Sequence, residues 1–164
     1  MKKLTPKGIK VLKSCHLIFV MIWVVGVITM GVISLSNPQS GDELYMSFHI
    51  TRFVDDFLVI PGAILTTFTG IIYGAFTNWG FFKHRWIIVK WIISLTVIIV
   101  GTFIFSPWLD TCLEISDKLR DAAIANPDVL HYSGLIFSAT VVQSAVLLFL
   151  VVISVFKPWK KTKK

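Results

Sequence analysis

Lys90 is the residue whose position in this sequence most strongly suggests chemistry. It lies five residues after Arg85 in the stretch FFKHRWIIVKW, residues 81–91, and Trp, Ile and Val surround it. At 1.5 Å per helical residue it is about 7.5 Å deeper than Arg85. An ionisable side chain inside a membrane span indicates function by default. The structural alternative is that the long lysine stem runs back to the headgroups.

No carboxylate is available to neutralise Lys90 on its own side of the chain. The nine acids all lie between the first and second or between the third and fourth apolar stretches, or at the start of the second: Asp42, Glu43, Asp55, Asp56, Asp110, Glu114, Asp117, Asp121 and Asp128. Lys90 is therefore solvated, deprotonated, or paired with an anion that is not a side chain. Lipid phosphate and a porphyrin propionate are two such anions.

His16 is the second candidate, because it lies at a similar depth. It follows Lys13 by three residues, about 4.5 Å along a helix, and shares a helical face with Phe19 and Trp23. The four histidines fall two to a side, His16 with His84 and His49 with His131. They can serve as ligands of two bis-histidine haem sites, or as ordinary interfacial residues.

A polar group on the opposite side offers a third kind of chemistry. Arg52 precedes Asp55 and Asp56 by three and four residues, so ion pairs can form along a helix. The same two acids can bind a cation or pass a proton. Met46 and His49 are soft ligands suited to copper, although two ligands do not make a site.

The elements that must position these residues are membrane spans. The chain has 164 residues, is 55% apolar and has a mean hydropathy of +0.77, which is far from the balance of a soluble domain. Stretches of the length needed to cross the hydrocarbon core occur at Leu17–Ser36, Phe57–Phe76, Ile87–Leu109 and Ser133–Phe156. We predict an all-α bundle of four transmembrane helices in one domain, 1–164.

The charge distribution predicts the orientation. The N-terminal segment, residues 77–85 and the tail KPWKKTKK hold twelve of the sixteen Lys and Arg and none of the acids. Because cytoplasmic loops are rich in Lys and Arg, we predict that both termini are cytoplasmic, in a bacterial inner membrane. The net charge of +7 therefore indicates topology and not nucleic-acid binding.

The predicted helices cover about 11–36, 53–76, 85–109 and 131–156, with an amphipathic segment at about 109–125 resting on the outer face. Pro61 is expected to kink the second helix about one turn below its outer end. Small residues then repeat every four positions, at Gly62, Thr66, Gly70 and Gly74. This ridge suits close packing of a neighbouring helix, within the chain or from a second copy or membrane partner.

Two motifs resemble known membrane proteins. LKSCHLIFVMIWVVG is similar to the first helix of small bacterial proteins that include the copper-resistance-protein-D-like proteins, the DUF2269-type proteins and the HemJ-type protoporphyrinogen oxidases. HRWIIVKW resembles the Trp-x-x-x-Lys stretch of the HemJ-type enzymes. The resemblance implies that His16 is a haem ligand and Lys90 a functional lysine, with Trp23 and Trp86 as neighbours; His84 opens the same motif.

Three functions are compatible with the sequence. The first is binding of b-type haem or a related porphyrin near the cytoplasmic leaflet, in redox or haem metabolism. The second is transport or handling of copper or a small solute, with Met21, Met30, Met46, His16 and His49 as soft ligands and Asp55 and Asp56 as an entry site. The third is a non-catalytic component of a membrane complex. Phosphate-loop, Cys-x-x-Cys and HExxH motifs are absent from the sequence.

Overall fold

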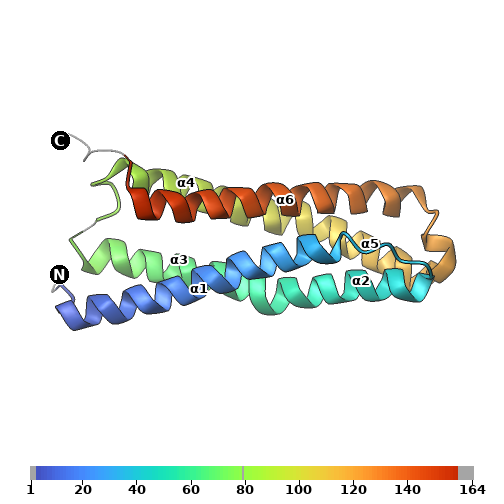
Figure 1. Cartoon of the computed structure of the whole chain (residues 1–164), viewed down its shortest axis with the longest axis horizontal. Coiled ribbons are helices and arrows are strands. Elements are labelled where there is room, and N and C mark those ends of the chain that lie inside the picture. Colours follow the sequence, from blue (N-terminus) through green and yellow to red (C-terminus); the bar gives the residue numbers. More distant parts are fainter. Residues whose placement is uncertain (1–2, 79, 159–164) are drawn as a thin grey trace.

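The structure is a computed structural model that describes residues 3–78 and 80–158. Its helices are almost all aligned with the long axis of the molecule, and successive spans run in opposite directions (Figure 1). Four continuous helical stretches are long and apolar enough to cross a membrane: Pro6–Ile33, Gly41–Phe76, Arg85–Ala123 and Pro127–Phe156. The predicted all-helical architecture with four spans is thus confirmed at this level.

Helix α1 (Pro6–Ile33) begins with local signals that the sequence contains. The Thr5 side chain accepts a hydrogen bond from the Gly8 N–H, and Pro6 occupies the first turn. The Leu4 N–H donates to the Phe76 carbonyl at 3.0 Å, which ties the start of α1 to the end of the second span. The last helix, α6 (Pro127–Phe156), starts similarly: Asn126 caps it by accepting from the N–H groups of Asp128 and Val129.

The second span is longer than predicted, because the helix begins twelve residues before residue 53. Helix α2 (Gly41–Val54) continues through a π-helical turn (Asp55–Val59) into α3 (Ile60–Phe76). The Ile60 N–H donates to the Asp55 carbonyl, five residues back. This wider turn lies directly before Pro61, which has no N–H to donate. The helix therefore begins at Gly41 and not near residue 53, and Pro61 lies well inside it.

The third span also contains a π-helical turn directly before a proline. Helix α4 (Arg85–Val100) passes through a π-helical turn (Gly101–Phe105) into α5 (Ser106–Leu119) and a short 3₁₀ turn (Arg120–Ala123). The Ser106 N–H donates to the Gly101 carbonyl, directly before Pro107. The prediction of a separate amphipathic segment resting on the outer face is therefore wrong. Residues 109–125 are mostly the continuation of α4, and α5 packs against α2 and α6.

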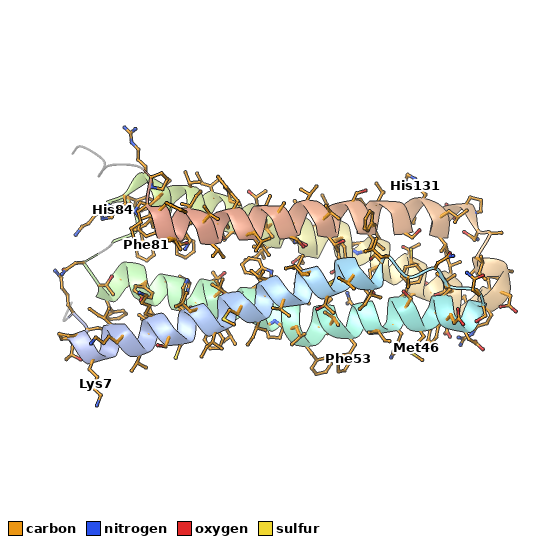
Figure 2. All side chains as sticks on the ribbon, viewed as in Figure 1. Lys7, Met46, Phe53, Phe81, His84 and His131 are labelled. Atoms are coloured by element: carbon orange, nitrogen blue, oxygen red, sulfur yellow. The ribbon has the colours of Figure 1, made fainter. Side chains whose placement is uncertain are left out.

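The two ends of the bundle differ in charge, and we name them accordingly. The basic end is where α1 begins, α6 ends and residues 77–84 connect α3 to α4; Lys7 and His84 lie there (Figure 2). The acidic end contains α2, α5 and the connections 34–40 and 124–126, and all nine carboxylates lie in or near it. At 1.5 Å per residue the two longest stretches span about 54–58 Å. That exceeds a hydrocarbon core of about 30 Å, so these two stretches are longer than a single crossing requires.

The tightly packed core lies in the middle and at the acidic end. Fully buried apolar side chains come from α1, α5 and α6, and include Val27, Met30, Leu109, Cys112 and Ile136. At the basic end packing is looser, because none of the α4 residues from 85 to 96 is buried. Figure 1 shows α1 beside α3 and α4 beside α6 at this end.

Candidate functional site

His16 points from α1 toward α3, where a threonine fixes its imidazole. Its Nδ1 lies 2.8 Å from Thr69 Oγ1, and its ring packs edge-on against Tyr73 at 5.8 Å. The Thr66 backbone also interacts with the imidazole. The side chain is half-buried and faces the bundle. These contacts come from one face of α3, where residues 66, 69 and 73 recur at helical spacing.

The hydrogen bonds of Thr69 determine which imidazole nitrogen carries the proton. Thr69 Oγ1 lies 2.7 Å from the Leu65 carbonyl and 3.0 Å from the Thr66 carbonyl. A hydroxyl has one proton, and these carbonyls accept it, so Oγ1 is left to accept from the imidazole. These contacts favour Nδ1 of His16 as the donor, which leaves the Nε2 lone pair available as a ligand. This is the arrangement by which proteins orient a metal-ligating histidine.

Lys90 is on the same side of the molecule and close to His16. Its ammonium acts electrostatically on the imidazole, and its Nζ lies 5.9 Å from the centre of the Trp86 ring, one turn back on α4. Across residues 3–78 and 80–158, no carboxylate lies within ion-pairing distance of Lys90. The side chain is partly buried.

Two further residues complete this group, and neither was predicted. A Cβ placed on Gly70 would lie 3.6 Å from the Trp91 ring and 4.0 Å from His16 Cε1, so both rings border Gly70. Thr66 Oγ1 is buried and makes no hydrogen bond to the described residues. We call His16, Thr66, Thr69, Lys90 and Trp91 the basic-end site. It presents a basic nitrogen, an unpaired hydroxyl and an unpaired cation beside an indole.

Trp23 does not belong to this site. It is 3% exposed and lies in the core, where its backbone would contact a Cβ on Gly62 at 2.8 Å. It follows His16 by seven residues, about 10.5 Å along α1. Its side chain fills the crossing of α1 and α3, and its role as a pocket neighbour stays a prediction. Trp86 stays near Lys90, with the ring of His84 at 6.1 Å.

Each of the four histidines packs against a different aromatic residue. His84 precedes α4 beside Trp86, whereas His16 is held by α3. At the acidic end His49 stacks on Tyr45 at 5.6 Å, and His131 packs against Tyr132 at 5.4 Å. Both of these acidic-end histidines are exposed. The interfacial interpretation therefore fits them better than axial ligation.

The soft ligands considered for copper are scattered over the molecule. Met21 is 64% exposed toward the lipid, Met30 is in the core and Met46 is 49% exposed at the acidic end (Figure 2). His16 lies at the other end. The part of the chain described here contains no group of three or more His, Cys, Asp or Glu that can hold a metal ion. These residues do not form one copper site.

The predicted Arg52 ion pairs form, and a third carboxylate joins them. Arg52 lies 3.5 Å from each of Asp55, Asp56 and Asp110. Asp55 is 5% exposed. Neither its Oδ2 nor Arg52 Nη1 makes a hydrogen bond of good geometry to the described residues. Asp110 comes from α5, so this group fastens the second span to the third where both have their π turns.

The small-residue ridge on α3 is used within the chain. Gly62 lies against the backbone of Trp23, Gly70 borders Trp91, and a Cβ on Gly74 would lie 2.5 Å from the Phe81 ring. Thr66 faces the basic-end site. The ridge therefore packs residues of the chain itself at these three glycines.

One cavity of about 550 Å³ lies at the acidic end, away from the basic-end site. It is bordered by the α1–α2 connection, α2 and the first turns of α6. Comparison with known protein families, curated proteins and solved structures finds no match to this chain. Fold and composition define a multi-pass, all-helical membrane protein with a cationic group at its basic end.

Proposed function

We propose that this protein binds a b-type haem or a related porphyrin at the basic-end site and takes part in redox or haem metabolism. In this proposal the basic end faces the cytoplasm of a bacterial cell, as the distribution of Lys and Arg favours. The observation that carries the proposal is the state of His16. Its Nδ1 lies 2.8 Å from Thr69 Oγ1, whose own proton can go to the Leu65 carbonyl, and this supports an imidazole that donates from Nδ1 and offers Nε2 as a ligand.

The chemistry of the donor set fits such a group. An imidazole nitrogen is the commonest protein ligand of haem iron. The ammonium of Lys90 suits a propionate, because it has no carboxylate of its own. Trp91 offers an aromatic surface beside His16. A bound haem would supply a redox-active iron, while His16, Lys90 and Trp91 would hold and orient the macrocycle.

Loose packing at the basic end supports a guest between α4 and the α1–α3 pair. None of the α4 residues from 85 to 96 is buried, although Trp86, Lys90 and Trp91 are on this segment. A protein interior is normally close-packed. The unpaired Thr66 hydroxyl beside His16 is a second sign that the site is incomplete without a ligand.

The test is the absorbance spectrum of protein purified from haem-replete cells, oxidised and reduced. We expect a Soret band that disappears in His16→Ala and persists in the matched variants His84→Ala and His131→Ala. Lys90→Met should weaken haem binding and Lys90→Arg should restore part of it, since Arg also pairs with a carboxylate. Colourless wild-type protein, or a band that survives in His16→Ala, would overturn the proposal.

A further inference from the structure

The cavity at the acidic end has a lining unlike that of the basic-end site. Its volume is about 550 Å³, and none of its lining residues is charged. Leu44, Phe48 and Ile136 form its buried apolar floor. Residues of the α1–α2 connection and hydroxyl side chains from α2 and α6 provide its polar side. Burying an unpaired charge here would be costly, so the lining selects an uncharged guest.

The rim of the cavity points to a guest from the membrane. Leu35, Leu130 and Phe137 border the cavity and are 68%, 59% and 36% exposed. These apolar rim residues come from the chain next to α1 and from α6, both of which continue into the hydrocarbon. Ser36 and Asn37 of the polar α1–α2 connection also border the cavity. A molecule with a polar head and a hydrocarbon tail matches this arrangement.

Most hydroxyl groups of the lining already donate their proton to the backbone, so toward a guest they can only accept. Ser34 donates to the Met30 carbonyl at 2.9 Å, Thr51 to the Ser47 carbonyl at 2.8 Å and Ser133 to the Leu130 carbonyl at 3.1 Å. Their protons are therefore used, and their lone pairs remain. Ser36 and Ser47 lie 3.3 Å apart, and one of them donates to the other. The other hydroxyl of that pair still has its proton and can donate it to a guest.

A head group that both donates and accepts fits this set of partners. A hydroxyl does both, whereas a ketone, ester or ether only accepts. We propose that the acidic-end cavity binds the head group of an uncharged lipid alcohol, with the lipid tail leaving over the apolar rim. The proposal does not depend on haem, because the cavity is at the opposite end from His16.

The test uses purified full-length protein in phosphatidylcholine nanodiscs and radiolabelled dioctanoylglycerol as the probe. We expect saturable binding that unlabelled dioctanoylglycerol displaces. Its O-methyl ether should compete about 2- to 10-fold less well, the range expected for one lost hydrogen bond. Dioctanoyl phosphatidic acid, which is charged, should compete poorly. Equal competition by alcohol and ether, or by alcohol and phosphatidic acid, would overturn the proposal.

Two variants place the binding in this cavity. A Cβ on Gly134 would meet nothing within 4 Å, so Gly134→Leu can fill the cavity without a clash at its base. It should abolish saturable binding, whereas Val142→Leu, on an exposed face of the same helix, should not. Thr51→Val should weaken binding about 2- to 10-fold by removing one acceptor.

The control for Thr51 is Thr96→Val, because Thr96 also donates to the carbonyl four residues back but is exposed on α4. Unchanged binding in both Gly134→Leu and Thr51→Val would overturn the assignment to this cavity. A Soret band that persists in Gly134→Leu would separate this outcome from a failure of the haem proposal.

Discussion

At the residue scale, the contact between His16 and Thr69 is the most informative in the basic-end site. It favours one imidazole tautomer, because the hydroxyl's own proton can go to a carbonyl of the α3 backbone. Partners of this kind typically change the affinity of a metal-ligating histidine about 10- to 100-fold. A sequence pattern cannot reveal it, because threonines also occur throughout spans as simple backbone-bonded residues.

Thr69→Val should therefore weaken haem binding about 10- to 100-fold. Valine keeps the shape of the side chain but leaves Nδ1 without its acceptor. Titration of the apoprotein with haem, followed at the Soret band, measures the change. Thr96→Val removes an equivalent backbone-bonded hydroxyl from α4 and should have no effect. An unaltered affinity in Thr69→Val would mean that the tautomer is fixed in some other way.

A second prediction at this scale concerns Arg52. It is the cation between three carboxylates, one of which, Asp55, is nearly fully buried. Removing one partner of a buried pair costs about 3–5 kcal/mol, because the other charge stays buried and unpaired. Arg52→Met should therefore strongly lower the free energy of unfolding, and Arg52→Met with Asp55→Asn should recover part of the loss.

Chemical unfolding in detergent micelles measures both changes. The comparison is Arg120→Met, whose partners Asp42 and Asp117 are exposed, so that its ion pairs should be worth about 1 kcal/mol or less. If Arg52→Met and Arg120→Met lower the free energy of unfolding by the same amount, the ion pairs of Arg52 are solvated and do not act as buried ion pairs.

At the element scale, the acidic end depends on one close approach between α2 and the end of α5. Arg120 leaves the helix with φ of 47°, in the left-handed region that side chains rarely adopt. Its guanidinium lies over Tyr45 at 4.2 Å, and it pairs with Asp117 at 2.8 Å. The next residue, Asp121, accepts from the Gly41 N–H at 2.6 Å. Arg120 and Asp121 thus hold the first turn of α2 against the end of the third span.

Gly41→Ala should undo that docking. An added Cβ would lie 2.0 Å from the Arg120 carbonyl carbon, and backbone atoms cannot rotate away as a flexible side chain can. Overpacking of this kind costs about 1–3 kcal/mol, which for a chain of this size lowers the unfolding midpoint by about 2–4 °C per kcal/mol. Thermal unfolding followed by circular dichroism measures it. Gly134→Ala, which meets open space, should leave the midpoint in place.

The same scale separates what the sequence predicts from what it does not. Apolar stretches are local, so the four spans follow from composition alone. The extension of the second span back to Gly41 and of the third to Ala123 does not, because residues 41–52 and 110–123 are polar enough to resemble connections. The π turns before Pro61 and Pro107 are also hidden in the sequence. Registers between helices are equally hidden, which is why Trp91 and Asp110 were not predicted.

At the scale of the whole molecule, charge and function are divided between two ends. The basic end contains the site proposed for a porphyrin and the acidic end the cavity proposed for a lipid alcohol. The start of α1 and the end of α6 lie at the same end of the molecule (Figure 1). These two helix ends are therefore on the same side of the membrane, whichever way the protein is inserted. The asymmetry of Lys and Arg predicts that this side is the cytoplasm, and the prediction can be measured directly.

Labelling of single cysteines in intact cells tests the orientation. In a chain whose Cys15 and Cys112 are replaced by serine, Asp42→Cys should react with a membrane-impermeant maleimide, since this side chain is 88% exposed at the acidic end. Lys7→Cys, exposed at the basic end, should react only after the membrane is permeabilised. The opposite pattern would place the acidic end in the cytoplasm, and with it the basic-end site on the outer side. The porphyrin would then have to reach His16 and Lys90 from outside the cell, which a role in cytoplasmic haem metabolism does not allow.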